Sequence, residues 1–324
     1  MAAETGPALD PVGPEPQPPH FYGGQAVLEG VMMRGKDHWA LAVRRPDTSI
    51  HLEAHHIDSV ANRYRVLCWP GFRGVIGLGQ ALAIGVKALT ASANQSAEEE
   101  AKLTRGQMAF SMTLALVLFI GLFVVGPAVL FSFFRRTVDS SILRNVLEGL
   151  FRVALFLGYL ALIGRMKDIR RVFQYHGAEH KTIAAFEHGE PLVPERVDRF
   201  STLHVRCGTN FLLIVMILTI LVFALFGNPP ILWAILSRIV AIPVIAGIAY
   251  ELLRLGAKYT HSPVMRFLMA PGLWLQKITT RPPSDDQIEV AIASFQEVLR
   301  AEGKLPPRTL DETGAAQEPA TSDS

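Results

Sequence analysis

The stretch MAFSMTLALVLFIGLFVVGPAVLFSFF, residues 108–134, is apolar over its whole length and contains no charged side chain. A helix of about 20 mainly apolar residues can cross the hydrocarbon core of a bilayer. Three other stretches have the same character, at about 145–164, 211–227 and 230–250. The sequence therefore predicts a mainly α-helical membrane protein with about four transmembrane helices.

The composition of the whole chain agrees with a membrane protein. Of the 324 residues, 50% are hydrophobic, and the mean hydropathy is +0.28. The net charge is only +2, and no arginine-rich helix is interleaved with aromatic residues, so nucleic-acid binding is not expected. Cys68 and Cys207 lie far apart and predict no disulfide framework. We expect the lipid bilayer to be the main partner.

Residues 21–66 favour a small β-rich module. The segment AVLEGVMM is apolar and partly β-branched, and HWALAVRRPDTSIHLEAHHI is typical of two strands around a Pro-Asp-Thr-Ser turn. Residues 67–104 contain GFRGVIGLGQALAIGVKAL, in which several glycines, Gln80 and Lys87 interrupt the apolar run. We predict an interfacial or re-entrant helix there, followed by a linker to the four-helix region at residues 105–256.

Residues 257–303 follow the last span and are predicted to stay on the membrane surface. The segment SPVMRFLMAPGLWLQKI is too short to cross and is broken by Pro271 and Gly272, while Trp274 and the flanking basic residues suit the interface. Residues 284–302 form an amphipathic pattern that begins with a capping-box spacing. Its cap and apolar stripe are Ser284, Gln287, Ile288, Ile292, Phe295 and Leu299. This helix is expected to dock on the β-rich module.

The distribution of basic residues predicts the orientation. The loop 165–210 carries eight of them, whereas the opposite side offers Arg135 and Arg136. Short loops rich in Lys and Arg remain in the cytoplasm. We therefore expect a multi-pass protein of the cell inner membrane with the β-rich module, this loop and both termini in the cytoplasm. The tails at 1–20 and 304–324 are rich in proline or small polar residues and are expected to be disordered.

The cytoplasmic loop contains FQYHGAEHKTIAAFEHG, residues 173–189, which is compatible with a helix that stops at Gly189. On a helix, His176 and His180 lie one turn apart on one face, where both imidazoles can reach one ion. Glu179 completes an H-x-x-E-H pattern, in which two histidines bind zinc and the glutamate activates water. The alternative is that these histidines are interfacial side chains at the end of a membrane helix.

A metal needs further ligands, and the predicted topology indicates where to look. Span two ends, span three begins and span four ends at the same membrane face. His204, Cys207 and Glu251 therefore lie at the face that carries the histidine motif. Glu251 is favoured by position, because an acid at the end of an apolar helix needs a cationic partner. It could equally pair with Arg254, while Cys207 or His204 could complete a zinc site.

The leading segment YGGQAVLEGVMMRG is the second unusual stretch, with glycines around Glu29 and Arg34. Such glycines indicate tight turns or a close approach of the backbone to a partner. A short strand with ordinary turn glycines explains them more simply than a substrate site, although Glu29 and Arg34 remain candidates.

Four stretches, YGGQAVLEGVMMRG, YHGAEHKTI, HVRCGTNF and YELLRL, resemble the YqhQ-like family, a bacterial membrane group of unknown function described as predicted metal-dependent enzymes. The resemblance runs from about Tyr22 to about Leu299. It implies metal dependence but no known substrate or reaction. The matching positions are Glu29, His176, Glu179, His180, His204, Cys207 and Glu251.

Two hypotheses follow from these residues. The first is a membrane-bound hydrolase with a divalent metal, zinc by its ligands, in which Glu179 is the general base and His176 and His180 are ligands. Glu251, Cys207 or His204 would supply the third ligand. The second is a non-enzymatic assembly factor or scaffold, in which four protein ligands hold a structural metal or a polar cluster fixes the helices.

Overall fold

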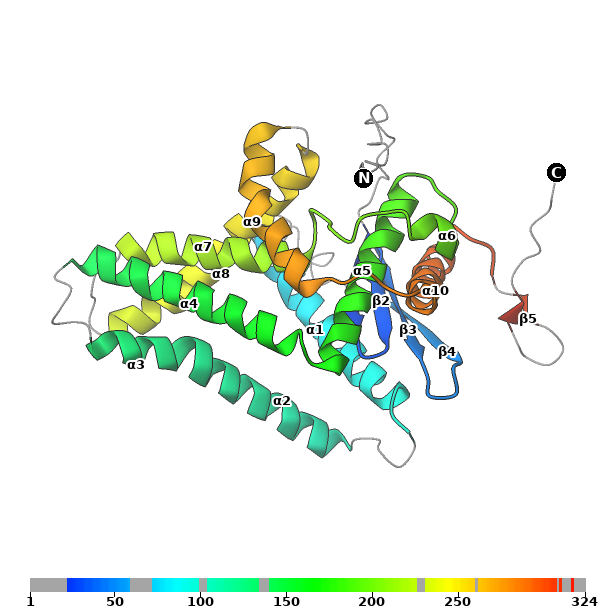
Figure 1. The fold of residues 1–324 in the computed structure, drawn as a ribbon, viewed down its shortest axis with the longest axis horizontal. Coiled ribbons are helices and arrows are strands. Elements are labelled where there is room, and N and C mark those ends of the chain that lie inside the picture. The colour runs from blue at the N-terminus through cyan, green and yellow to red at the C-terminus, as the bar shows by residue number, and fades with distance from the viewer. Residues whose placement is uncertain are drawn as a thin grey trace, which may run out of the picture.

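The computed structural model describes residues 22–58, 72–98, 104–133, 140–225, 231–259 and 262–307, together with two short strands near the C-terminus. Long helices form one end of an elongated molecule, and a small sheet with its covering helices forms the other (Figure 1). The predicted mainly helical architecture with a small N-terminal sheet is confirmed. The N-terminal tail and Cys68 lie outside the described residues.

The elongated part consists of the segments that we predicted as spans. They run beside one another along the long axis of the molecule (Figure 1). The first is continuous through a short π-helical turn, and α7 packs against both α4 and α8. Their bounds are α2 Arg105–Ile120, η4 Gly121–Val125, α3 Gly126–Phe133, α4 Ser141–Ile163, α7 Gly208–Leu225 and α8 Ile231–Lys258. Each lies within a few residues of its prediction, except that α8 extends to Lys258.

Helix α1, Phe72–Gln95, adds a fifth candidate to the four predicted spans. Within the described residues, five helices are long and apolar enough to cross a membrane, and α1 is one of them. However, Ile84 and Ala88 on one face of α1 are buried against the sheet, while Leu82 on another face is 62% exposed. A helix that covers a sheet on one side and is apolar on the other suits the membrane interface. The interfacial or re-entrant helix predicted from the sequence stays a prediction, and the structure adds that one face of α1 covers the sheet.

The sheet is an antiparallel meander with the strand order β1-β2-β3-β4. Its strands are β1 Gly23–Val27, β2 Gly30–Arg34, β3 His38–Arg44 and β4 Ile50–His56. The tight β1–β2 turn places Glu29 at a φ of 50°, a left-handed conformation that is uncommon for a residue other than glycine. The predicted strand pair around the Pro-Asp-Thr-Ser turn is β3 with β4.

Helices α5, Lys167–Glu187, and α10, Asp285–Ala301, cover the face of the sheet opposite to α1. The predicted apolar stripe of α10 is buried there, and the Ser284 N–H donates to Gln287 Oε1 at 3.0 Å as the capping-box spacing predicts. The predicted docking of this helix on the β-rich module is therefore confirmed. Because α5 follows directly after α4, this packing fixes the HGAEH motif between the sheet and the long helices.

The remaining elements are short or lie across the ends of the long helices. Helix α9, Pro263–Thr279, is continuous through Pro271, and α6 is the single turn Pro194–Val197. Two short strands, β5 Thr309–Leu310 and β6 Ala316–Gln317, pair within the C-terminal segment that we expected to be disordered.

Glu302, directly after α10, joins the end of that helix to the sheet. Its carboxylate accepts hydrogen bonds from Tyr22 Oη at 3.0 Å, the Lys36 N–H at 2.6 Å and Lys304 Nζ at 3.0 Å. Burial raises the pKa of this carboxyl, but the hydrogen bonds outweigh burial and hold its pKa below the usual value of 4.5. The ionised form is therefore the one that the fold stabilises.

A Glu302→Gln variant should be less stable than the wild type by about 2 kcal/mol at neutral pH, because hydrogen bonds to a charged acceptor are lost. A carboxyl with a lowered folded pKa contributes stability above its unfolded pKa and loses it as the pH falls through the folded pKa. The difference between variant and wild type should therefore shrink below pH 4.5. Denaturation in detergent at several pH values tests this, with the more exposed Glu289→Gln as the control.

Candidate metal centre

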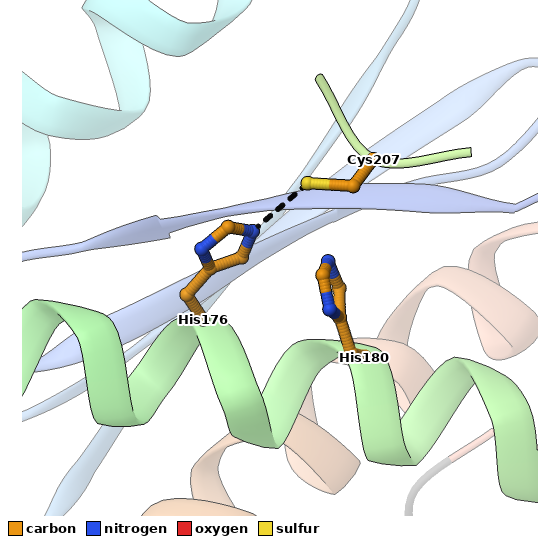
Figure 2. Close-up of side chains that lie close together, drawn as sticks. All are labelled: His176, His180 and Cys207. Atoms are coloured by element: carbon orange, nitrogen blue, oxygen red, sulfur yellow. Dashed lines mark hydrogen bonds between the residues drawn. The ribbon is translucent and has the colours of Figure 1, made fainter. Parts of the chain in front are cut away.

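The HGAEH motif lies in the second half of α5, a helix that places its two histidines on one face. It ends at Glu187, and Gly189 follows with a φ of +70°, as the predicted stop requires. The rings of His176 and His180 lie 4.4 Å apart between centroids. Both rings extend from α5 toward Cys207, which comes from a separate segment of the chain (Figure 2).

These three side chains form what we call the His–Cys cluster: His176, His180 and Cys207. One ligand atom from each lies within 4.8 Å of the other two. The His176 Nε2 atom is 3.1 Å from Cys207 Sγ (Figure 2). Helix α7 begins at Gly208, so Cys207 directly precedes a long apolar helix and Thr209 lies in its first turn. The cluster therefore joins α5 to the start of a candidate membrane helix.

Backbone carbonyls orient both imidazoles of the cluster. Nδ1 of His176 donates to the Thr279 carbonyl oxygen at 2.9 Å, and Nδ1 of His180 donates to the Thr202 carbonyl oxygen at 2.5 Å. A carbonyl oxygen can only accept, so each Nδ1 carries the proton and each Nε2 presents a lone pair. Metal-bound histidines in proteins are held in this way.

The Nε2 atom of His180 is the strongest indication that the cluster is suited to a cation. His180 is 1% exposed, and this buried atom makes no hydrogen bond of good geometry within the described residues, although the Cys207 thiol lies close enough to interact with the ring. Burial lowers the pKa of the imidazole, which keeps it neutral, while the Cys207 side chain opposes this effect. A buried acceptor without a donor costs about 1–3 kcal/mol, and a metal ion would remove this cost.

The donor set fits zinc. Zinc accepts imidazole nitrogen and thiolate sulfur in a tetrahedral arrangement. Three protein ligands with an open fourth position are typical of catalytic zinc, whereas four protein ligands are typical of structural zinc. The His–Cys cluster by itself supplies three.

Glu179 lies beside the cluster but is not part of it. Its side chain is 5% exposed and accepts a hydrogen bond from the Gly24 N–H of strand β1. Burial raises the pKa of this carboxyl, an effect that His176 and His204 partly offset. A Cβ atom at Gly24 would lie 2.8 Å from Glu179 Cγ, so the glycine allows the strand to approach this closely. The glycines of the leading motif thus include one that touches the candidate base.

His204 is next to the cluster without joining it. Its ring is 5.6 Å from that of His180, and its Nε2 lies 3.6 Å from Glu187 Oε2. The Gln276 side chain bonds both backbone groups of His204, each at 2.8 Å. Burial lowers the pKa of His204, and burial also lowers the pKa of the neighbouring Arg206, which pairs with Glu187, to about 10.

The structure does not bring the other predicted site residues to the cluster. Glu251 forms a two-pronged ion pair with Arg73 of α1, with distances of 2.8 and 2.6 Å. Glu29 pairs with Arg171 of α5, and Arg34 donates to Gln80 of α1 at 2.6 Å. These contacts hold the sheet, α1 and the long helices together. Of the predicted ligands, His176, His180 and Cys207 converge, and Glu251 does not.

The family described as "Protein of unknown function (DUF1385)" matches residues 69–301. The chain belongs to the DUF1385 family. It is also 36% identical to "Uncharacterized protein YqhQ" of Bacillus subtilis (strain 168) over 302 residues, which cover 88% of this chain and 94% of that relative. This confirms the resemblance based on the four sequence stretches. No solved structure matches the chain.

Several residues that position the His–Cys cluster could not be predicted from the sequence. Thr202 and Thr279 act through their carbonyl groups, which a side-chain motif cannot reveal. Gly177 is part of the motif itself, and its role lies in its size. A Cβ atom there would lie 2.2 Å from the Arg281 carbonyl oxygen, so glycine lets the 279–281 segment pass close to α5. Gly177, between His176 and Glu179 in the motif, is the one feature of the sequence that indicates a close approach of another segment here.

Proposed function

We propose that this DUF1385 chain is a membrane-bound, metal-dependent hydrolase with a zinc site at the cytoplasmic membrane face. The observation that carries the proposal is the His–Cys cluster, with the buried Nε2 of His180 directed into it. Two oriented imidazoles of α5 and the thiol of a separate segment are brought together there. Such convergence at a buried position is typical of a metal site.

The residues of the cluster would hold the ion, and Glu179 would handle the proton. Zinc with three protein ligands acts as a Lewis acid on water or on a substrate carbonyl. Glu179 is a buried carboxyl beside the cluster, and burial raises its pKa, which suits a group that accepts and returns a proton. The Gly24 N–H keeps its carboxylate in position.

The position of the cluster supports an assignment to the cytoplasmic membrane face. It lies between the sheet and the start of α7, in the segment that carries the excess of basic residues. By the same reasoning we place both termini in the cytoplasm and the protein in the cell inner membrane. The five apolar helices support the bilayer as its environment.

The burial of the cluster favours a second candidate function. Cys207 is 9% exposed and His180 is 1% exposed, while His176 is partly buried, and a fourth protein ligand would close the site as in structural zinc. In that case the chain would be a non-enzymatic assembly factor or scaffold. His204, 5.6 Å from His180 between ring centroids, is the residue placed to supply a fourth ligand after a rotation of its ring.

Metal analysis of the detergent-purified protein tests the site. We expect about one zinc ion per chain, and a loss of that metal in His176→Ala, His180→Ala and Cys207→Ser variants. The matched control is His188→Ala, which changes a histidine near the end of the same helix and should keep the metal. A wild-type chain without stoichiometric transition metal under non-chelating conditions would refute the proposal.

A Glu179→Gln variant separates an enzyme from a scaffold. The amide keeps the shape of the side chain but cannot accept the proton, so we expect the metal to stay and the function in cells to be lost. The measurement is rescue of cells that lack the protein, with metal content determined in parallel. Full rescue with metal retained would remove Glu179 as a base and favour the scaffold.

A further inference from the structure

Helix α9 crosses the ends of α7 and α8, and one of its faces is buried by this packing. Met269 and Gly272 are buried on that face. Gly272 touches Asn210 of α7, and Met269 touches Gly256 of α8. The long helices therefore hold one face of α9.

The opposite face of α9 is apolar as well, but it is exposed. Phe267 is 79% exposed, Trp274 is 67% exposed and Val264 is 61% exposed. Phe267 and Trp274 are seven residues apart and so lie on one stripe of the helix. A helix that is apolar on both faces needs a non-aqueous environment on the side that the protein does not cover.

The lipid surface is the occupant that best fits this face. After a short connection α9 follows α8, whose last part is a candidate membrane span from Val240 to Lys258. Arg266 and Lys277 are exposed on α9, and the helix has no acidic residue. An apolar stripe with exposed tryptophan beside basic side chains is typical of a helix in the headgroup layer of an anionic leaflet.

The same helix reaches the His–Cys cluster with its last turn. The Thr279 carbonyl accepts from His176 Nδ1 at 2.9 Å, and the Gln276 side chain bonds the His204 backbone at 2.8 Å. Thr279 comes five positions after Trp274, and five steps correspond to about 7.5 Å along a helix. The cluster thus lies close to the surface that Trp274 marks.

We propose that α9 couples the lipid surface to the metal centre: its exposed face is seated among anionic phospholipid headgroups, and its last turn holds the carbonyl that orients His176. The contact of α9 with lipid headgroups, which we call the lipid seat, is independent of the proposed hydrolase. The effect of this contact on His176, which we call the coupling, rests on the proposed metal site. Contact with anionic lipid stabilises the position of α9, and this position keeps Thr279 on His176.

The lipid seat is tested with the full-length protein in nanodiscs of phosphatidylcholine with or without phosphatidylglycerol. The Trp274 signal is the fluorescence difference between the wild type and Trp274→Phe. We expect lipids brominated near the headgroup to quench this signal, and aqueous iodide to leave it unchanged. Quenching by iodide would place the face in water, and quenching by neither would place it under protein, such as a second copy. Either result overturns the proposal.

The coupling is tested by zinc affinity in the same nanodiscs. Phe267→Asp should weaken zinc binding about tenfold, as loss of a group that orients a ligand does. The control is Val193→Asp, which changes an apolar side chain that is 42% exposed in the segment before α6 and should have no effect. An unchanged affinity in Phe267→Asp overturns the coupling.

A milder variant covers the case in which Phe267→Asp does not fold. We expect wild-type zinc affinity to be higher with phosphatidylglycerol present, and Arg266→Gln with Lys277→Gln to remove this difference. If the double variant keeps the difference, or if none exists in the wild type, the coupling is wrong. A wild type that binds no zinc refutes the metal site, while the Trp274 measurement still decides the lipid seat.

Discussion

A Gly177→Ala variant should bind zinc about 10- to 100-fold more weakly than the wild type, although all three side chains of the His–Cys cluster remain. The new Cβ atom would lie 2.2 Å from the Arg281 carbonyl oxygen, well inside van der Waals contact. The 279–281 segment must therefore move away from α5. That movement breaks the hydrogen bond from His176 Nδ1 to the Thr279 carbonyl, and the imidazole ring loses its orientation.

Competition with a chromophoric chelator measures this affinity. The matched control is Gly158→Ala in α4, where a Cβ atom would meet nothing within 4 Å. Alanine favours a helix over glycine at both positions, so a general helix effect would act in the same direction in both variants. If Gly177→Ala binds zinc as tightly as Gly158→Ala, the carbonyl of Thr279 does not position the ligand.

A Gly272→Ala variant should be destabilised by about 3 kcal/mol or more, because it overfills the crossing of α7 and α9. The new Cβ atom would lie 1.2 Å from Asn210 Oδ1 and 3.0 Å from Asn210 Cα, so rotation of the asparagine side chain alone cannot relieve the clash. Asn210 is fully buried, and its Nδ2 donates to the Val205 carbonyl at 2.8 Å. The two helices must therefore separate.

Thermal unfolding in detergent should show this loss as a lower midpoint, with Gly158→Ala again as the control. Adding Asn210→Ala to Gly272→Ala removes the side-chain atoms at 1.2 and 2.3 Å and leaves the contact with the Cα of residue 210, so the double variant should recover part of the stability that Gly272→Ala loses. Non-additivity of this sign is what residues in direct contact produce. Strict additivity of the two substitutions would mean that the crossing does not depend on this contact.

The long elements of the fold could be predicted from the sequence, because each carries its own pattern. The apolar stretch 108–134 and the stripe of α10 need no knowledge of distant residues. Helix α1 was harder to assign, since its glycines weaken the apolar run although the helix is continuous over 24 residues. One face of α1 covers the sheet. Contact between segments that are distant in the chain cannot be predicted from a local sequence pattern.

Part of the candidate site could likewise be predicted from local sequence, and part depends on contacts between distant segments. The spacing of His176 and His180 placed both on one face of a helix, and the predicted topology narrowed the further ligand candidates to His204, Cys207 and Glu251. The choice between Cys207 and Glu251 depended on Arg73, which lies in α1 and takes the Glu251 carboxylate. Only the packing of α1 against α8 decides this pairing. Thr202 and Thr279 act through their backbone carbonyls, which any residue type has, so the residue type at these positions does not predict the contact.

The contact between Gly24 and Glu179 bears on where this protein can be divided. The family match begins at residue 69, after the four strands have ended. Yet strand β1 holds the candidate base, and the sheet covers the apolar faces of α5 and α10. A fragment trimmed to the matched region would expose those faces to water and release Glu179. A unit that is expressed, or exchanged between relatives, therefore has to include the four strands.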